Sequence, residues 1–208
     1  MSRATSRRPD GGNDRVRILK EEVLSDDWGR LTKYTITWKR RDGRREEQLR
    51  QVYDRGDGAA ILPYDPKRGT VLLVRQFRIP VYLNQRPGRD RDGMLIEACA
   101  GLLDANDPET AIRKEAEEEL GYRLADIRLV FDAYMSPGSV SEHLALFIAR
   151  YSPADRISAG GGDESEGEDI EILEPTLDEA LAMVARGDIG DGKTIMLIQH
   201  LKLHGLGA

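Results

Sequence analysis

The sequence predicts an α+β protein: an α/β/α sandwich with a mixed sheet, preceded by a small N-terminal antiparallel β-sheet piece. Continuous apolar runs at residues 59–62 and 71–74 indicate strands that are covered on both faces. Helical periodicity at residues 177–185 and 194–203 supplies helices to cover them. Alternating apolar and polar residues before position 56 indicate a separate, half-buried sheet.

The N-terminal part of the chain divides into a tail and a strand-rich piece. Residues 1–14 lack apolar periodicity, and we expect a disordered tail there. Three strands and a hairpin turn follow, at residues 16–19, 31–38, 41–44 (the turn) and 48–53. In the second strand, Tyr34, Ile36 and Trp38 share one face. Three such strands make too little core of their own, so we expect the 15–56 piece to dimerise.

The main domain is expected over residues 57–208. A turn at residues 65–69 joins its first two strands, and further strands are expected at 127–131 and 143–151. The polar segment 85–92 is predicted to be a mobile loop. A glycine-rich acidic segment at residues 160–169 separates the last of these strands from the two covering helices.

The centre of the chain reads as a strand, a tight loop and a helix. Asp107 is placed to cap the helix, Pro108 suits its first position, and Gly121 supplies a left-handed end. The strand and loop before this helix span residues 97–104.

Three glutamates on this helix crowd one face. Glu115, Glu118 and Glu119 stand at positions i, i+3 and i+4, and like charges at this spacing repel by about 0.2–0.5 kcal/mol per pair. A bound Mg²⁺ would turn the repulsion into attraction, because hard cations prefer carboxylate oxygen. The alternative is an ordinary solvated helix with two i, i+4 ion pairs, Arg113–Glu117 and Lys114–Glu118.

Composition excludes several classes of protein. The net charge of -6 argues against nucleic acid as a partner, because binding phosphates needs a basic face. No apolar run approaches the roughly 20 residues that span a membrane, and the N-terminus does not resemble a signal peptide. The single cysteine, Cys99, is expected to be a small packed residue. A cytoplasmic enzyme fits this pattern.

The motifs of the chain resemble those of one enzyme family. The loop at Gly101, the glutamate helix and Gly121 resemble the Nudix signature, with Lys114 at the position of its usual arginine. Further matching blocks extend the resemblance to the bacterial GDP-mannose pyrophosphatase branch of the Nudix hydrolases: residues 55–58, 75–78, 97–104, 134–138, 160–162, 168–171 and 191–194. The resemblance covers the chain from about Val16 to its C-terminus, and it implies a Nudix α/β/α sandwich.

The resemblance implies a Mg²⁺ site, with Mn²⁺ as an alternative. Its metal ligands would be the carbonyl of Ala100 and the carboxylates of Glu115, Glu119 and Glu168. Glu118 would stand beside them as a further ligand or as a partner of the ligands, and it would share the catalytic role with Glu168, which would also help to deprotonate the attacking water. Whether the base is Glu168 or a neighbour such as Glu166 stays open, and the acidic segment alone also fits a solvated charge cluster.

Substrate contacts follow from the same resemblance. Trp28 would stack on the base, and Arg50, Arg78 and Lys193 would bind phosphate oxygens. Glu142 would face the sugar or a metal. Further contacts are expected from the residues Ala100, Gly101, Leu102 and Gly167. Each of these charged residues also fits an ordinary surface salt bridge.

The resemblance implies hydrolysis of GDP-mannose to GMP and mannose 1-phosphate by a homodimer. Its N-terminal strands would be exchanged, so that Trp28 and Arg50 serve the partner's site. An ADP-ribose pyrophosphatase is an alternative with the same chemistry. A nucleotide-sugar binding module without turnover is a second alternative, which loss of Glu115 or Glu119 would favour, and both glutamates are present.

Overall fold

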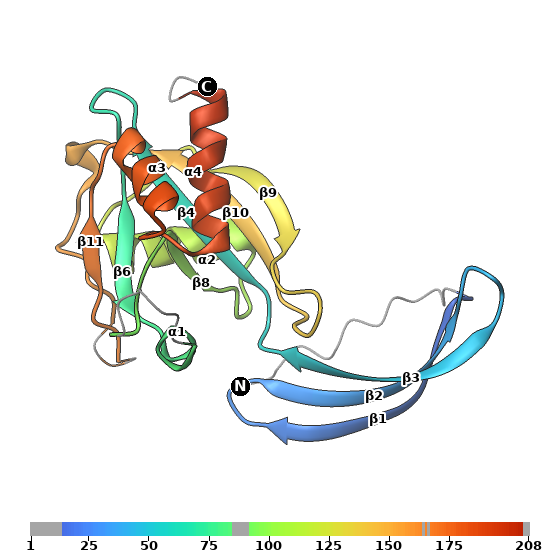
Figure 1. Ribbon diagram of the computed structural model, residues 1–208. Helices are drawn as coiled ribbons and strands as arrows, with labels where there is room; N and C mark the ends of the chain where they lie inside the picture. The colour runs from blue at the N-terminus through green and yellow to red at the C-terminus, as the bar shows by residue number, and fades with distance from the viewer. Residues whose placement is uncertain (1–13, 85–91, 164, 166, 206–208) are drawn as a thin grey trace. The chain divides into compact units, whose positions relative to one another are not determined.

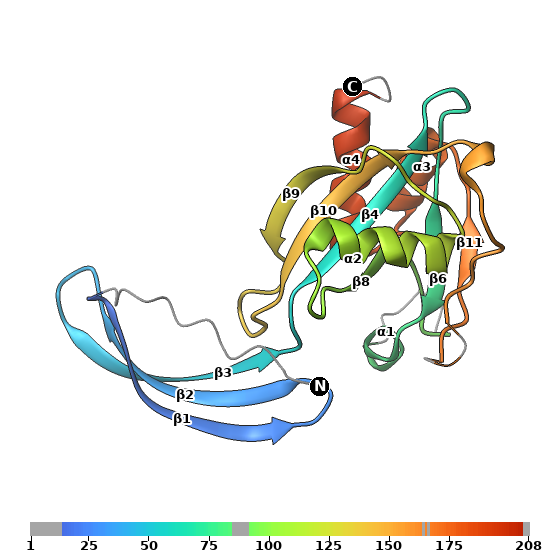
Figure 2. The same cartoon turned by 180° about the vertical axis from the view of Figure 1, so that it is seen from behind.

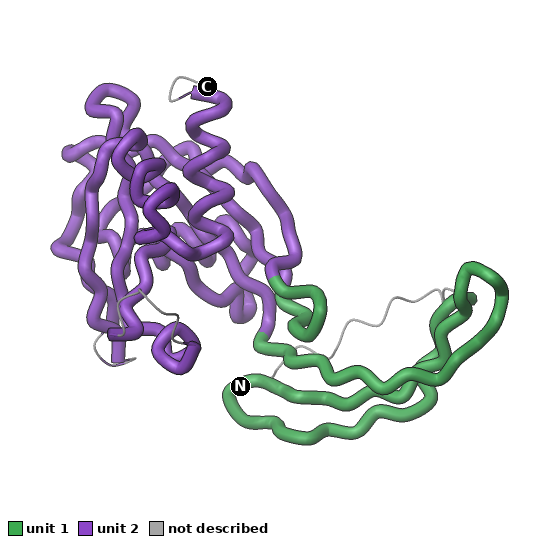
Figure 3. Tube along the Cα trace, in the orientation of Figure 1, with its two compact units in different colours: residues 1–55, 136–142 green, residues 56–135, 143–208 purple. Residues whose placement is uncertain are grey.

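The computed structural model describes residues 14–84, 92–163, 165 and 167–205. The chain forms two compact units, unit 1 (Met1–Arg55 with Ser136–Glu142) and unit 2 (Gly56–Met135 with His143–Ala208), which Figure 3 colours separately. The expected tail at residues 1–14 lies outside the described residues except for Asp14, and the expected loop at 85–92 lies outside them except for Asp92.

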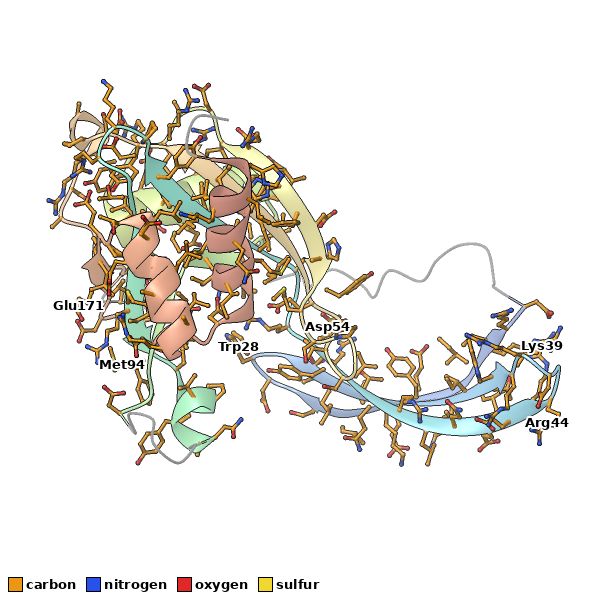
Figure 4. All side chains as sticks on the ribbon, turned by 45° about the horizontal axis from the view of Figure 1, so that its top comes forward. Trp28, Lys39, Arg44, Asp54, Met94 and Glu171 are labelled. Carbon is orange, nitrogen blue, oxygen red and sulfur yellow. The ribbon has the colours of Figure 1, made fainter. Side chains whose placement is uncertain are left out.

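Unit 1 is built on a three-stranded antiparallel sheet in the order β1-β2-β3. Its strands are β1 (Val16–Asp26), β2 (Arg30–Lys39) and β3 (Arg45–Asp54). They match the three predicted strands but run further, because cross-strand pairing continues through polar residues that break the apolar alternation. Trp28 and Asp54 mark one end of the sheet, and Lys39 and Arg44 mark the other (Figure 4).

The sheet of unit 1 has little core of its own. Neither hydrophobic cluster of the described part of the chain contains a residue from it. Several large apolar side chains on it are instead exposed: Ile18, Leu19, Val23, Leu24, Trp28 and Leu49. The face that carries Ile36 also carries Ile18 and Val23, because these two pair with Ile36 and Thr32.

Unit 2 contains a mixed sheet and a smaller antiparallel one. The first has the order β5-β4-β10-β9, with β8 also pairing with β4, and only its β4–β10 pair is parallel among the described pairs. Its strands are β4 (Gly58–Asp65), β5 (Thr70–Val71), β8 (Cys99–Leu102), β9 (Arg128–Tyr134) and β10 (His143–Arg150). The second has the order β11-β6-β7, with β6 (Leu73–Phe77), β7 (Met94–Glu97) and β11 (Glu171–Leu173).

Helices cover both faces of unit 2, as the two opposite views show (Figures 1 and 2). Helix α2 (Pro108–Glu115) lies on one side, and α3 (Leu177–Arg186) and α4 (Gly192–His204) lie on the other. Strand β4 is buried on both faces, which explains why its sequence is continuously apolar. Ala59 and Ile61 belong to the core on the α2 side, and Ala60 and Leu62 belong to the core on the α3–α4 side. The predicted α+β sandwich with a mixed sheet is confirmed.

Some short elements were not predicted. Helix α1 (Ile79–Leu83), the 3-10 turn at Pro153–Asp155, and strands β7 and β11 are too short to give a periodic pattern. Among the described residues, no helix has the length and apolar character that a membrane span requires.

Candidate active site

The glutamate helix begins as the sequence predicts. The Asp107 carboxylate accepts a hydrogen bond from the Thr110 N–H at 3.0 Å, and Pro108 occupies the first turn. Gly121 ends the helix in a left-handed conformation with φ of 75°, as predicted, but the last turn before it, Ala116–Leu120, is π-helical. Such turns change the helical spacing and occur frequently at functional sites.

The π-helical turn separates the three glutamates. Glu119 is buried, with only 1% of its surface exposed, and Glu115 is half-buried. Glu118 is exposed, and its Oε2 atom lies 3.2 Å from Lys114 Nζ, which is one of the two expected ion pairs. Because the regular spacing stops at residue 116, the expectation that all three carboxylates crowd one face fits only Glu115 and Glu119.

The other expected ion pair, Arg113–Glu117, is replaced by two different pairs. Arg113 binds Glu109 at 2.8 Å, one turn earlier on α2. Glu117 binds Arg123 at 2.9 Å, beyond the end of the helix. The hydrogen bond to Arg123 is the largest cause of the lowered pKa of Glu117.

The triple glycine of the late acidic segment caps the π-helical turn. The N–H groups of Gly161 and Gly162 donate to the carbonyls of Glu119 and Glu118, at 2.9 and 3.2 Å. Carbonyls at a helix end need such partners. Gly160, Gly161 and Gly162 all have positive φ, and a Cβ on Gly160 would lie 2.6 Å from the carbonyl oxygen of Glu119. The segment that carries Glu168 is thereby joined to the glutamate helix.

Gly101 makes room for the Glu115 carboxylate. A Cβ at Gly101 would lie 2.2 Å from Glu115 Oε1. Strand β8 therefore approaches α2 closely, and this places the backbone of Ala100 and Gly101 beside the acidic side chains. Any side chain larger than hydrogen at position 101 would displace the carboxylate.

Glu119 lies in a buried polar environment at the start of β8. Its Oε2 accepts the Ala100 N–H at 3.3 Å, and its carboxylate also accepts the thiol of the fully buried Cys99. Burial, followed by the charges of Glu115, Glu168 and Glu97, raises the pKa of Glu119 to about 8. Burial and the charge of Glu119 also raise the pKa of Cys99, so the expected packed cysteine additionally hydrogen-bonds the site.

The donor chemistry of this cluster fits a hard divalent cation. Glu115, Glu119 and Glu168 present carboxylate oxygens, and burial of Glu119, together with the charges of the other two, favours a proton on Glu119 near neutral pH. Within the described residues, no three acidic, thiol or imidazole side chains already converge on a single metal position. An ion would draw the carboxylates together as it replaces that proton.

Beside this cluster, Glu97 holds two of the predicted phosphate-binding cations. Arg78 Nε donates to its Oε1 at 2.6 Å, and Lys193 Nζ donates to its Oε2 at 2.5 Å. Burial alone lowers the pKa of Lys193, but the charges of Glu97 and Asp191 outweigh burial, so the pKa is raised. Lys193 is therefore a buried cation with two carboxylate partners, whereas Arg78 stays partly exposed.

The sequence contains a signal for Glu97, which is not among the predicted site residues. It interrupts a run of apolar residues from Met94 to Ala100, and a buried carboxylate in such a run requires cationic partners. The sequence could therefore have predicted its pairing, but not which cations supply it.

Three of the predicted substrate residues belong to unit 1. The Arg55 guanidinium lies 5.2 Å from the ring centroid of Trp28, and Arg55 Nε lies 3.1 Å from Glu142 Oε1. Arg55 thus links Trp28 to Glu142, a role that the sequence did not predict. Arg50 donates to Gln48 Oε1 at 2.7 Å and to the Leu49 carbonyl at 2.8 Å.

The remaining predicted residues lie on β8 and in the acidic segment. Gly101 and Leu102 are half-buried on β8, and Gly167 is exposed with φ of 79°. Glu168 Oε2 accepts the Asp163 N–H at 2.9 Å. Glu166, the alternative base, lies outside the described residues. A cavity of about 550 Å³ between the turn that precedes β5, the start of α3 and the end of α4 has none of the predicted site residues in its lining.

Comparison with known proteins identifies both parts of the chain. Residues 15–53 match the family model of the GDP-mannose pyrophosphatase NudK N-terminal domain, and residues 54–197 match that of the NUDIX domain. A GDP-mannose pyrophosphatase from Pectobacterium atrosepticum is 52% identical over 91% of this chain and 95% of its own length. Those from Yersinia enterocolitica and Escherichia coli are 47% and 46% identical, over 92% and 90% of this chain and 97% and 95% of their own lengths.

These matches extend over the carboxylate cluster, the glycine-rich cap and the N-terminal sheet. Nudix hydrolases generally use divalent metal ions such as Mg²⁺, which agrees with the donor chemistry of the cluster. The chain belongs to the Nudix hydrolase family, in the branch that carries the NudK-type N-terminal domain.

Proposed function

We propose that this protein hydrolyses the diphosphate bond of GDP-mannose, releasing GMP and mannose 1-phosphate. The observation that carries the proposal is the likeness to proteins named GDP-mannose pyrophosphatase, at 46–52% identity over nearly the whole chain. The carboxylate cluster beside β8 supplies a place for the chemistry.

The proposed metal ligands are the Ala100 carbonyl and the carboxylates of Glu115, Glu119 and Glu168. When bound, Mg²⁺ or Mn²⁺ would neutralise the diphosphate and stabilise the negative charge on the leaving phosphate. Glu168 would accept a proton from the attacking water. Glu118 would act beside these residues, as a further metal ligand or as a partner of one of the ligands, and its Oε2 atom lies 3.2 Å from Lys114 Nζ.

The proposed phosphate contacts come from the edge of the cluster. Arg78 is partly exposed and has further N–H groups beyond the Nε that binds Glu97, so it is suited to a phosphate oxygen. Lys193 would act through Glu97, because its ammonium is buried between two carboxylates. Backbone groups of Gly101, Leu102 and Gly167 complete the proposed substrate contacts.

The proposed base and sugar contacts come from unit 1. The ring of Trp28 is exposed and contacts the guanidinium of Arg55 within the unit. Because the ring stays exposed beside Arg55, it has surface on which a base can stack. Arg50 would reach a phosphate, and Glu142 would face the sugar. We further propose a homodimer with exchanged N-terminal strands, in which Trp28 and Arg50 serve the partner's site. The exposed apolar side chains of the unit 1 sheet support such an interface.

We place the enzyme in the cytoplasm. Its single cysteine is a buried free thiol, which fits a reducing compartment. Nucleic acid is not a proposed partner, because the net charge is -6 and binding phosphates needs a basic face.

A panel of nucleotide sugars incubated with purified protein and Mg²⁺ tests the proposal. GMP released from GDP-mannose, at a kcat/KM well above that for ADP-ribose, is the expected result. AMP as the main product, from ADP-ribose, would identify an ADP-ribose pyrophosphatase instead. Absence of product from every substrate would favour a nucleotide-sugar binding module without turnover. Glu119→Gln should abolish turnover, and Glu21→Gln, on β1, is the matched control.

A further inference from the structure

Gln76 carries a buried hydrogen-bond donor without a protein acceptor. The side chain lies on β6 and is 6% exposed. Its amide nitrogen has no hydrogen-bond partner, and it is the one buried side-chain polar atom of this kind within the described part of the chain. Buried polar groups are nearly always paired, so an orphan amide indicates an acceptor that arrives from outside the protein.

The strand register places Gln76 on the face that carries the carboxylate cluster. Strand β6 lies between β11 and β7, and Met94 and Glu171 mark these two neighbours in Figure 4. Val74 pairs with Glu97 on one side and with Ile172 on the other, so these three side chains share a face. Gln76 follows Val74 by two residues and therefore lies on that face as well.

This face is the one covered by the glutamate helix. Val74 packs in the same core cluster as Ala116 and Leu120 of the π-helical turn. Ile170, which belongs to that cluster too, stands beside Gln76 when the β6–β11 register is continued by one residue. Glu168 precedes Ile170 by two residues. Gln76 thus lies between the strand that ends in Glu97 and the segment that carries Glu168.

The nearby carboxylates already have other donors. The two oxygens of Glu97 accept Arg78 and Lys193. Glu119 Oε2 accepts the Ala100 N–H, and Glu168 Oε2 accepts the Asp163 N–H. A cationic side chain at position 76 would form an ion pair with one of these carboxylates, as Lys193 does with Glu97. A neutral amide stays available for a ligand oxygen that enters the cluster.

We propose that the Gln76 side-chain amide donates a hydrogen bond to a diphosphate oxygen of the bound substrate. The inference rests on the proposed function and adds a substrate-binding residue to it. Because the donor is fixed in a buried strand, it needs little reorganisation to bind the diphosphate, and this makes it effective in a site from which water is excluded.

Gln76→Met tests the donor with almost no change in shape. Removing one preorganised donor lowers turnover by as much as about 100- to 1,000-fold in other enzymes, and we expect a fall in kcat/KM of about tenfold or more here. The thermal midpoint should not fall, because the substitution removes a polar group that lacks a partner in the free protein. Gln199→Met, at an exposed position of α4, is the matched control and should leave both quantities unchanged.

A binding measurement separates this inference from the proposed function. Methylenediphosphonate with Mg²⁺ contains the diphosphate geometry without base or sugar, and its affinity can be measured by calorimetry whether or not GDP-mannose is hydrolysed. Weaker binding to Gln76→Met than to wild type supports the inference. Equal binding and equal kcat/KM would overturn it, even if GMP is released.

A second variant distinguishes a substrate-binding role of Gln76 from a purely structural role. Gln76→Glu keeps the shape and replaces the amide donor with a carboxyl group, so it should also weaken binding of methylenediphosphonate. If Gln76→Met lowers the thermal midpoint and Gln76→Glu retains wild-type affinity for methylenediphosphonate, the amide is a structural group and the inference is wrong.

Discussion

At the scale of single residues, Glu119 links the stability of the protein to its metal site. Its pKa is raised to about 8, mainly by burial, whereas an unfolded glutamate titrates near 4.3. Between these values the folded state holds a proton that the unfolded state has lost, so the metal-free protein loses stability as pH rises from about 5 to 8. A bound cation reverses the effect, because it favours the ionised carboxylate.

Glu119→Gln should remove much of this pH dependence. The amide is uncharged at every pH, so the thermal midpoint in EDTA should fall less between pH 6 and pH 8 than it does for wild type. Thermal unfolding of both proteins at these two pH values checks the prediction. Glu118→Gln is the control, because Glu118 is exposed and should leave the pH slope intact. A wild-type slope in Glu119→Gln would show that another group is responsible.

A second residue-scale prediction concerns the space beside Glu115. In Gly101→Ala the new methyl group would meet the Glu115 carboxylate at 2.2 Å, so the carboxylate must move away from β8. We expect weaker Mg²⁺ binding, measured as a smaller rise in thermal midpoint when Mg²⁺ is added, together with reduced turnover. Gly190→Ala is the control, because a Cβ there meets no atom within 4 Å. Equal Mg²⁺ responses in the two variants would contradict the assignment of Glu115.

Some of the site residues could be predicted from the sequence and others could not. Glu115 and Glu119 follow from spacing along one helix, which is local information. The contacts of Glu119 with Cys99 and Ala100 require β8 to pack on that helix, so no local pattern reports them. The unpaired amide of Gln76 is still harder to predict from the sequence, because it depends on which hydrogen-bond acceptors the folded chain brings near it.

At the scale of elements, the end of the glutamate helix depends on a distant segment. Asp107, Pro108 and Gly121 were predictable as helix ends because their effect is local. The π-helical turn was not, because its carbonyls are capped by Gly161 and Gly162, about 40 residues further along the chain. From the sequence alone the segment also fits a solvated charge cluster, whereas in the structure the N–H groups of its glycines bind the carbonyls at the helix end.

Gly160→Ala should measure what this cap contributes. Gly160 has φ of 69°, and its Cβ would lie 2.6 Å from the Glu119 carbonyl oxygen, so alanine adds a backbone clash to the cost of positive φ. Gly69→Ala is matched in backbone strain, because Gly69 has φ of 71° and open space around it. Positive φ alone costs about 1 kcal/mol or more, and Gly160→Ala should lose clearly more free energy of unfolding than Gly69→Ala.

Urea denaturation of the two glycine variants gives this comparison directly. Gly160→Ala should also lose turnover, since the glycine segment joins Glu168 to the glutamate helix. Gly69→Ala should keep it. If the two variants lose the same free energy of unfolding, backbone strain accounts for the whole effect, and the close approach of Gly160 to the helix end adds nothing measurable.

At the scale of the whole molecule, unit 1 contains one segment that the sequence analysis places in the main domain. Residues 136–142 lie within the expected 57–208 domain, but they belong to unit 1. The Tyr53 N–H donates to the Ser139 carbonyl at 2.8 Å, and the Ser141 N–H donates to the Tyr53 carbonyl at 3.1 Å. This pairing joins positions more than 80 residues apart, and neither partner shows a periodic pattern that predicts it.

The sheet of unit 1 gives a prediction about assembly. Ile18 and Val23 are exposed on the same face as Ile36, and exposed apolar side chains on a sheet without a core of its own favour association. We expect the wild-type protein to be a dimer in solution. The double variant Ile18→Glu/Val23→Glu should shift it towards monomers, because two carboxylates per chain would then have to be desolvated in the interface.

Light scattering coupled to size-exclusion chromatography checks this at several protein concentrations. Leu203→Glu is the control, because it adds one carboxylate per chain, half the charge of the double variant, at a position that is 80% exposed on α4 and belongs to unit 2. If Trp28 and Arg50 serve the partner's site, turnover per chain should fall in the double variant as the dimer dissociates, and should recover at higher protein concentration. A monomeric double variant with full turnover would leave unit 1 as an assembly surface and would remove it from the proposed active site.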